Sequence, residues 1–157
     1  MTPLPIAIGA DHIGYDLKEA VKACLTERGA AFQDFGTHSR DRTDYPLFAE
    51  AVARAVLDGT AARGILICGT GVGMAIAANK LPGIRAVVCS EPYSAALSRQ
   101  HNDTNVLAFG AQVVGPGLAR LIVTAWLDAD YEAGRHARRV AMIAQLERDA
   151  AQQEPAP

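Results

Sequence analysis

Short apolar runs alternate along the chain with longer stretches in which apolar residues recur every three or four positions. A short apolar run indicates a buried strand, whereas the longer spacing indicates a helix packed on one face. The runs predict strands at Ile6–Gly9, Ala31–Phe35, Gly64–Cys68, Arg85–Cys89 and Asn105–Phe109. The stretches between and after them predict helices at Tyr15–Arg28, Pro46–Leu57, Val72–Asn79, Pro92–Gln100, Leu118–Leu127 and Arg135–Ala150. Strands alternating with helices are typical of a parallel sheet covered by helices.

The pattern predicts one α/β domain over residues 1–150, without linker or internal repeat. We expect a Rossmann-like, three-layer architecture with about five parallel strands and a C-terminal helix. A chain of 157 residues is long enough to bury such a core without disulfides. The last residues, 151–157, offer nothing to bury, and we expect a disordered tail there.

Composition narrows the possible partners. Fifteen Lys and Arg stand against seventeen Asp and Glu, a net charge of −2, so we expect no nucleic-acid or membrane-surface binding. The longest apolar runs are too short to cross a bilayer, and the start of the chain does not resemble an export signal. The three cysteines are widely spaced without a C-x-x-C pair, which favours a reducing cytoplasm over a disulfide framework.

Residues that follow the predicted strands are candidates for a site, because parallel sheets bind ligands at the carboxyl ends of their strands. Asp11 and His12 follow the first strand, and Cys68 ends the third. The helix after the fourth strand ends in a polar cluster that contains His101 and Asn102. We expect these titratable groups to converge on one rim of the sheet.

The turn after the third predicted strand reads Cys-Gly-Thr-Gly-Val-Gly, from Cys68 to Gly73. Alternating glycines let backbone N–H groups approach a ligand, and the helix that begins there favours a bound anion. The turn lacks the lysine of a Walker A loop, and Met74 stands where a dinucleotide-binding fingerprint needs its last glycine. It also lacks the arginine of a cysteine phosphatase loop. An anion-binding turn remains, with a cysteine at its mouth.

Each candidate side chain also has a structural interpretation. Helix N-termini favour the thiolate form of cysteine, so Cys68 could serve as a base or nucleophile, whereas Cys24 and Cys89 are better read as buried core residues. His12 could cap a loop, and His101 could belong to a solvated surface. Arg135 and Arg139 share a helical face beside Arg138, and such a set is either a solvated face or a phosphate clamp.

The chain closely resembles ribose-5-phosphate isomerase of type B, a family that includes the allose- and galactose-phosphate isomerases. The resemblance runs from about Ile6 to Ala144. It is carried by Gly-Ala-Asp11-His12-Ile-Gly, Arg-Thr-Asp44-Tyr45-Pro, Gly-Ile-Leu-Ile-Cys68-Gly-Thr-Gly-Val-Gly, Ala-Ala-Asn-Lys, Ser-Glu-Pro-Tyr-Ser-Ala, Ser-Arg-Gln-His101-Asn102-Asp-Thr-Asn-Val-Leu-Ala-Phe-Gly and Gly-Arg135-His-Ala-Arg-Arg139.

The resemblance implies an aldose–ketose isomerase of the pentose phosphate pathway, which interconverts ribose 5-phosphate and ribulose 5-phosphate through ring opening and a cis-enediolate. It implies that Cys68 is the base, that the turn Gly69–Gly73 with Thr70 and Val72 holds the enediolate oxygen, and that His101 opens the furanose ring. It further implies that Asn102, Asp11 and Tyr45 bind the sugar. His12, Arg135 and Arg139 match groups around the phosphate. Sites shared between two subunits are implied, hence a homodimer or a dimer of dimers.

One position departs from the pattern. Gln112 stands where many relatives carry a phosphate-contacting arginine, so either the clamp has less charge or another residue such as Arg138 compensates. Three alternatives to a ribose-5-phosphate isomerase stay open: a six-carbon isomerase of the same family, a nucleotide-binding module with Glu91 on a ribose, and a thiol redox protein. Because no cluster with metal-ligand spacing is apparent and proton transfer needs no redox group, we expect neither metal nor cofactor.

Overall fold

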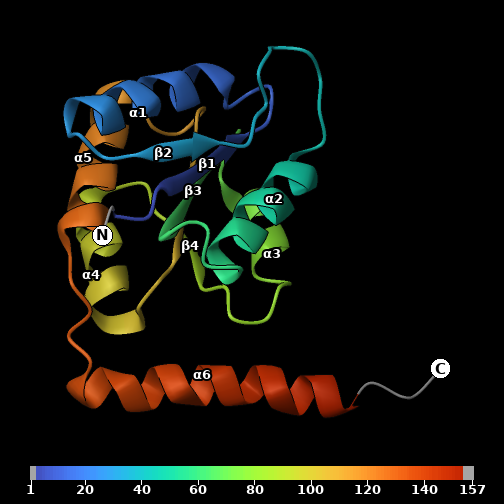
Figure 1. The fold of residues 1–157 in the computed structure, drawn as a ribbon, viewed down its shortest axis with the longest axis vertical. Helices are drawn as coiled ribbons and strands as arrows, with labels where there is room; N and C mark the ends of the chain where they lie inside the picture. Colours follow the sequence, from blue (N-terminus) through green and yellow to red (C-terminus); the bar gives the residue numbers. More distant parts are fainter. Residues whose placement is uncertain (1–2, 154–157) are drawn as a thin grey trace.

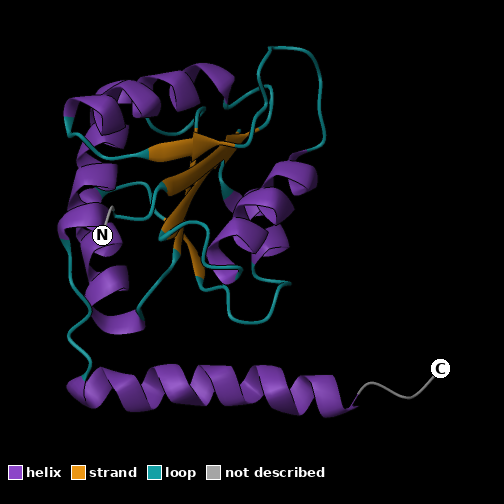
Figure 2. Ribbon diagram, viewed as in Figure 1, coloured by secondary structure: helices purple, strands orange, loops and turns teal. Residues whose placement is uncertain are grey.

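Five parallel strands form the centre of the protein, in the spatial order β2-β1-β3-β5-β4. The computed structural model describes residues 3–153 (Figures 1 and 2). The strands are β1 (Ile6–Ala10), β2 (Phe32–Asp34), β3 (Arg63–Cys68), β4 (Ala86–Val88) and β5 (Val106–Gly110). The helices are α1 (Tyr15–Glu27), α2 (Tyr45–Leu57), α3 (Val72–Ala78), α4 (Pro92–Asn102), α5 (Pro116–Asp128) and α6 (Gly134–Gln153).

Helices cover both faces of the sheet, so the domain has three layers. Along β3, Ile65 and Ile67 pack under α1, α4 and α5, whereas Leu66 and Cys68 pack under α2 and α3. This division follows from the two-residue period of a strand, which sends successive side chains to opposite faces. Because both faces are covered, the central strands are apolar throughout, as parallel strands are.

The expected α/β fold is confirmed, with its five parallel strands and C-terminal helix. The differences lie at element ends. α5 begins at Pro116 rather than Leu118, because Pro suits the first turn of a helix and the extended Gly115 precedes it. α6 continues to Gln153, three residues into the segment expected to be a disordered tail, and residues 154–157 lie outside the described part.

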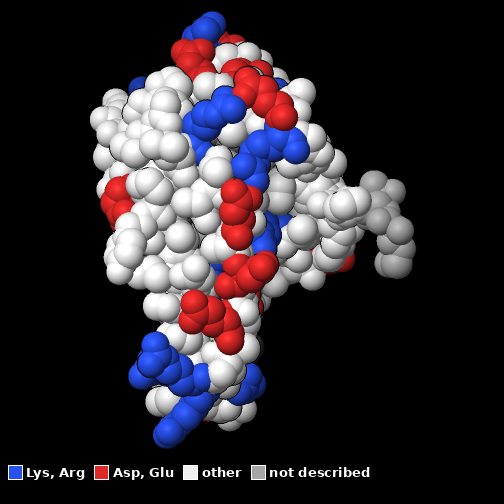
Figure 3. Space-filling view, turned by 90° about the vertical axis from the view of Figure 1, so that its left-hand side faces the viewer, with Lys and Arg blue, Asp and Glu red and all other residues white. Residues whose placement is uncertain are grey.

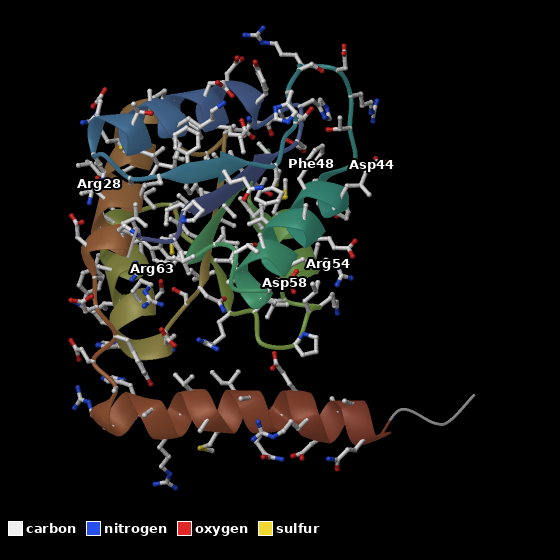
Figure 4. The ribbon with its side chains drawn as sticks, viewed as in Figure 1. Arg28, Asp44, Phe48, Arg54, Asp58 and Arg63 are labelled. Atoms are coloured by element: carbon white, nitrogen blue, oxygen red, sulfur yellow. The ribbon has the colours of Figure 1, made fainter. Side chains whose placement is uncertain are left out.

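The carboxyl ends of the parallel strands form one edge of the sheet, and their amino ends form the opposite edge. Asp44 and Phe48, at the start of α2, lie near the carboxyl ends of the strands, and Asp58 and Arg63 lie toward the amino ends (Figure 4). α6 runs below the amino edge, where Gly83 N–H donates to its Glu147 (Figure 1). Among residues 3–153, none of the helices has the length and apolarity needed to cross a membrane.

Candidate active site

The turn after β3 holds Cys68 against backbone amides. The Cys68 side chain is buried, and the Gly71 N–H donates to its sulfur at 3.1 Å. Gly71 has φ +81°, a conformation that disfavours residues with a Cβ. Val72 N–H donates to the Thr70 hydroxyl at 3.3 Å, and Val72 opens α3. A sulfur atom and the amide end of a helix therefore meet at one point, which suits a base beside a developing anion.

The start of the turn packs against the chain that leaves β5. A Cβ on Gly110 would lie 2.5 Å from Thr70 Cα, so the two backbones are in close contact. Gln112 N–H donates to the Gly69 carbonyl at 3.0 Å, and the Gln112 amide oxygen faces Gly69. The uncharged Gln112, which departs from the family pattern, therefore lies directly beside the glycine turn.

Asp11 and His12 lie beside the same turn. Asp11 N–H donates to the Ile67 carbonyl, which places Asp11 next to the end of β3. One oxygen of the buried Asp11 carboxylate accepts from Ile13 N–H at 3.0 Å and Gly14 N–H at 2.9 Å. Thr43 N–H donates to His12 Nδ1 at 3.3 Å, so His12 is tied to the loop before α2.

Tyr45 completes this arrangement from α2. Its ring lies against Gly73, where a Cβ would be 2.7 Å from two of the ring carbons. Tyr45 is 40% exposed, so its side chain borders the surface next to the turn. We call Asp11, His12, Tyr45, Cys68 and the turn Gly69–Gly73 the carboxyl-edge group.

His101 and Asn102 lie at the opposite edge of the sheet. They end α4, and the Asn102 carbonyl accepts from Arg85 Nε at 3.1 Å just before β4 begins. Cys68, by contrast, pairs with Gly110 at the carboxyl ends of β3 and β5. A strand of this length spans roughly 17–20 Å. The expectation that all titratable groups converge on one rim of a single chain is wrong, because α4 runs antiparallel to the strands and ends at their amino edge.

The first turns of α6 add a basic surface to this amino edge. Arg135, Arg138, Arg139 and Met142 line a hollow of about 490 Å³. Lys and Arg side chains gather at the lower end of the molecule in Figure 3, over the start of α6. Within residues 3–153, no carboxylate forms an ion pair with these three arginines, so their charge is available to an anion. We call His101, Asn102, Arg135, Arg138 and Arg139 the amino-edge group.

His101 stacks on a second histidine that comes from α6. The rings of His101 and His136 are 4.1 Å apart and within 4° of parallel. Glu132 lies beside both, 3.9 Å from His101 Nε2 and 3.8 Å from His136 Nε2. Burial, the neighbouring His101 and Arg135 lower the pKa of His136, against the opposing effect of Glu132. The lower pKa favours the neutral form of the His136 ring.

These three side chains also offer metal-ligating atoms within 4.8 Å of one another. A metal ion lies close to the plane of an imidazole that binds it. Two parallel rings stacked face to face cannot both meet that condition around one ion without turning. Arg135 Nε also donates toward His136 Nε2 at 3.3 Å. The arrangement fits an aromatic pair rather than a metal site.

Two of the residues around the amino-edge group were not singled out from the sequence. His136 stands inside the Gly-Arg-His motif, but its contact with His101 joins positions 35 residues apart and has no local signal. Glu132 lies in the loop before α6, where its N–H donates to the Gln100 carbonyl at 3.0 Å. Only the packing of that loop on α4 brings Glu132 close to His101 and His136.

A parallel α/β domain with a thiol at an amide-lined turn and a separate arginine cluster fits the class of enzymes that bind a phosphorylated substrate and stabilise an anionic intermediate. The chain belongs to the ribose/galactose isomerase family, whose model matches residues 6–143. It is 63% identical to ribose-5-phosphate isomerase B of Escherichia coli over 142 residues, 90% of this chain and 95% of that protein.

Two further relatives extend the comparison. The chain is 45% identical to D-erythrulose-4-phosphate isomerase of Pectobacterium atrosepticum over 145 residues, 92% of this chain and 95% of the relative. The structure of ribose-5-phosphate isomerase B from Clostridium thermocellum superposes with a TM-score of 0.92 at 52% identity. The match covers 94% of this chain and 99% of the Clostridium chain. The resemblance read from the motifs is confirmed, and the chain is a member of an isomerase family.

Proposed function

We propose that the protein interconverts ribose 5-phosphate and ribulose 5-phosphate by ring opening and proton transfer through a cis-enediolate. The observation that carries the proposal is the contact of Cys68 sulfur with the Gly71 N–H in a glycine turn. Isomerisation needs a base beside donors for an oxyanion, and this turn supplies both. A positioned base contributes roughly 10²–10⁴-fold, and one oxyanion donor about 2.7–4 kcal/mol.

The residues of this chain can supply every proton transfer that the isomerisation needs. The Cys68 thiolate takes the proton from C2 of the open-chain aldose, and the electron pair moves to the carbonyl oxygen at C1. Amides of the Gly69–Gly73 turn, with Thr70 beside them, stabilise that oxygen. The hydroxyl proton at O2 moves to O1, and the Cys68 thiol returns its proton to C1. The product is the ketose, with no net change of redox state and no need for a redox cofactor.

The remaining residues bind and prepare the substrate. In the proposal, His101 opens the furanose by taking the anomeric hydroxyl proton and delivering a proton to the ring oxygen. Asp11, Tyr45 and Asn102 bind the sugar hydroxyl groups. His12, Arg135 and Arg139 bind the phosphate, where guanidinium groups match the oxygen geometry.

This division of labour requires two copies of the chain. A five-carbon sugar phosphate cannot contact both groups of one protomer, because the full height of the sheet separates them. A two-fold axis that brings the carboxyl-edge group of one copy to the amino-edge group of the other completes two equal sites. Apolar side chains are exposed on α3 and α6 and could bury against a partner: Val72, Ile76, Met142, Ile143 and Leu146. We infer a homodimer, alone or paired further, with shared sites.

Complementation tests the shared site. Cys68→Ser and His101→Asn proteins are each unfolded, mixed in equal amounts and refolded together. Half of the re-paired dimers are mixed, and each has one of its two sites intact, so roughly a quarter of wild-type activity returns. The two proteins refolded separately serve as controls. Activity no higher than in these controls would contradict a site built from two chains.

Exchange of solvent hydrogen tests the chemistry. In D₂O the wild-type protein should place deuterium on C1 of ribulose 5-phosphate while it forms ribose 5-phosphate. Cys68→Ser should slow both deuterium incorporation and isomerisation by 10²-fold or more. Cys24→Ser should leave both rates unchanged, since Cys24 lies on the buried face of α1. Near-normal turnover by Cys68→Ser would remove this cysteine from the reaction.

The relatives leave sugar length as the alternative to test. A six-carbon allose or galactose phosphate, or the four-carbon sugar phosphate of the Pectobacterium relative's name, could also use a thiol beside amides. Gln112 beside Gly69 leaves the phosphate end less charged than an arginine would. Turnover of four-, five- and six-carbon substrates side by side decides this. Three free, buried cysteines support our inference that the protein works in the reducing cytoplasm.

A further inference from the structure

His136 lies in direct contact with His101 and is not among the groups assigned to substrate. Its ring covers one face of His101 at 4.1 Å, with only 4° between the two planes. The His136 side chain is buried, whereas His101 is partly exposed. His136 therefore covers one face of His101, and about 33% of the His101 side chain remains exposed to solvent.

The backbone that carries His136 is itself held in one arrangement. Ala133 has φ +50°, an unfavourable conformation for a residue with a Cβ, and its carbonyl accepts from His136 N–H at 2.8 Å and Ala137 N–H at 3.2 Å. The preceding residue, Glu132, is tied to the end of α4 through the Gln100 carbonyl. Strain of this kind persists only where the surroundings determine it. Here the backbone at Ala133 sets the direction in which α6 leaves and brings the first turn of α6 over His101.

From these contacts we propose that His136 is a positioning residue for ring opening: its ring face holds the His101 imidazole in the orientation that reaches the sugar. The proposal rests on the proposed function, because it takes His101 as the ring-opening group. The face of His136 holds the His101 ring, because the two ring planes are in contact. Its Nε2 accepts a hydrogen bond from Arg135 Nε at 3.3 Å and lies 3.8 Å from the Glu132 carboxylate, beyond hydrogen-bond distance.

The lowered pKa of His136 supports this reading. A neutral ring can stack on His101 when the latter takes up a proton, whereas two facing imidazolium rings would repel each other. Arg135 and Arg139 act in the same direction as burial on the pKa of His136, and Glu132 opposes them. The lowered pKa favours the neutral form of the His136 ring beside His101.

The substrates provide an assay that separates ring opening from enediolate chemistry. Ribose 5-phosphate closes to a furanose through O4 and must be opened. Ribulose 5-phosphate cannot close to a furanose, because the required oxygen, O5, carries the phosphate. Isomerisation of ribose 5-phosphate therefore needs His101, whereas exchange of the C1 proton of ribulose 5-phosphate needs only Cys68 and the turn.

His136→Ala should lower the rate of ribose 5-phosphate isomerisation roughly three- to tenfold, the effect of losing an aromatic pair. Deuterium incorporation at C1 of ribulose 5-phosphate should stay within about twofold of wild type. His136→Phe keeps a flat ring and should retain most of the isomerisation rate. His38→Ala, an exposed histidine away from the pair, is the matched control and should change neither reaction.

A double-mutant cycle completes the test. If His136 acts only through His101, adding His136→Ala to a His101→Asn protein should cost no further activity. Equal loss of both reactions in His136→Ala, or no loss in either, would overturn the proposal. So would a His136→Phe protein as impaired as His136→Ala. A wild-type protein that catalyses neither reaction refutes the proposed function instead, which keeps the two failures apart.

Discussion

Gly71→Ala tests whether the turn around Cys68 depends on glycine for conformation and for space. Gly71 adopts φ +81°, and an added Cβ would lie 2.7 Å from Phe109 Cα and 2.8 Å from the adjoining backbone atoms of β5. A left-handed conformation costs a residue with a Cβ about 1–2 kcal/mol. Forcing extra volume into a packed core costs about 1–3 kcal/mol more. We therefore expect the free energy of unfolding to fall by about 2–5 kcal/mol.

Two other glycines separate these contributions. Gly59 has φ +71° with open space around it, so Gly59→Ala should show the conformational cost alone. Gly117 is the second residue of α5 and has neither constraint, so Gly117→Ala should be neutral or slightly stabilising. For a domain of this size, 1 kcal/mol shifts the melting temperature by about 2–4 °C. Gly71→Ala should therefore melt about 4–20 °C below wild type, and clearly below Gly59→Ala.

The same substitution should impair catalysis more than stability alone explains. Moving the Gly71 N–H away from the Cys68 sulfur misplaces a donor at the point where charge develops, an effect of roughly 10²–10³-fold on kcat. Melting curves at one protein concentration and initial rates well below the melting temperature check both effects. A Gly71→Ala protein that melts with Gly59→Ala and turns over ribose 5-phosphate normally would refute the reasoning.

Three further outcomes are expected. Iodoacetamide at pH 7.5 should label Cys68 but not Cys89, and ribose 5-phosphate should protect Cys68 from the reagent. Burial and Glu91 raise the pKa of the Cys89 thiol to about 11. Only roughly one Cys89 thiol in 3000 is therefore ionised at this pH. Comparable labelling of both, by peptide mass spectrometry, would count against this. Asp34→Asn should destabilise the fold by about 3 kcal/mol, because the buried Lys18 ammonium loses one of its two carboxylate partners. Burial alone raises the pKa of Asp34, but hydrogen bonds from Lys18 and Lys22 outweigh it and lower the pKa, so this stability is present above about pH 4 and lost as pH falls further. Urea unfolding of wild type should therefore weaken more steeply below pH 4 than that of Asp34→Asn, and parallel curves would contradict the assignment. Arg138→Gln should raise the KM for ribose 5-phosphate about threefold to tenfold with little change in kcat, whereas Arg148→Gln, farther along α6, should change neither constant.

The parts of the candidate site that are formed by residues close together in the sequence could be predicted. The alternating glycines after a buried strand predicted an amide-lined turn, and the structure has Gly71 N–H on the Cys68 sulfur. Asp11 beside the end of β3 follows in the same way, because a residue after one parallel strand lies near the end of its neighbour. The prediction failed for His101, since a position at the end of a helix says little about the edge of the sheet at which that helix ends.

The apolar periodicity determined the α/β fold, since strand and helix periods of two and about 3.6 residues dictate which faces are buried. The motifs determined the isomerase family and the position of Cys68 at the start of the glycine turn. Tertiary structure alone decided that Cys68 and His101 lie at opposite edges of one sheet and that His136 covers His101. These relations depend on strand order and on the direction in which α4 and α6 leave the sheet. They join residues distant in the chain, and short-range patterns carry no information about such pairs.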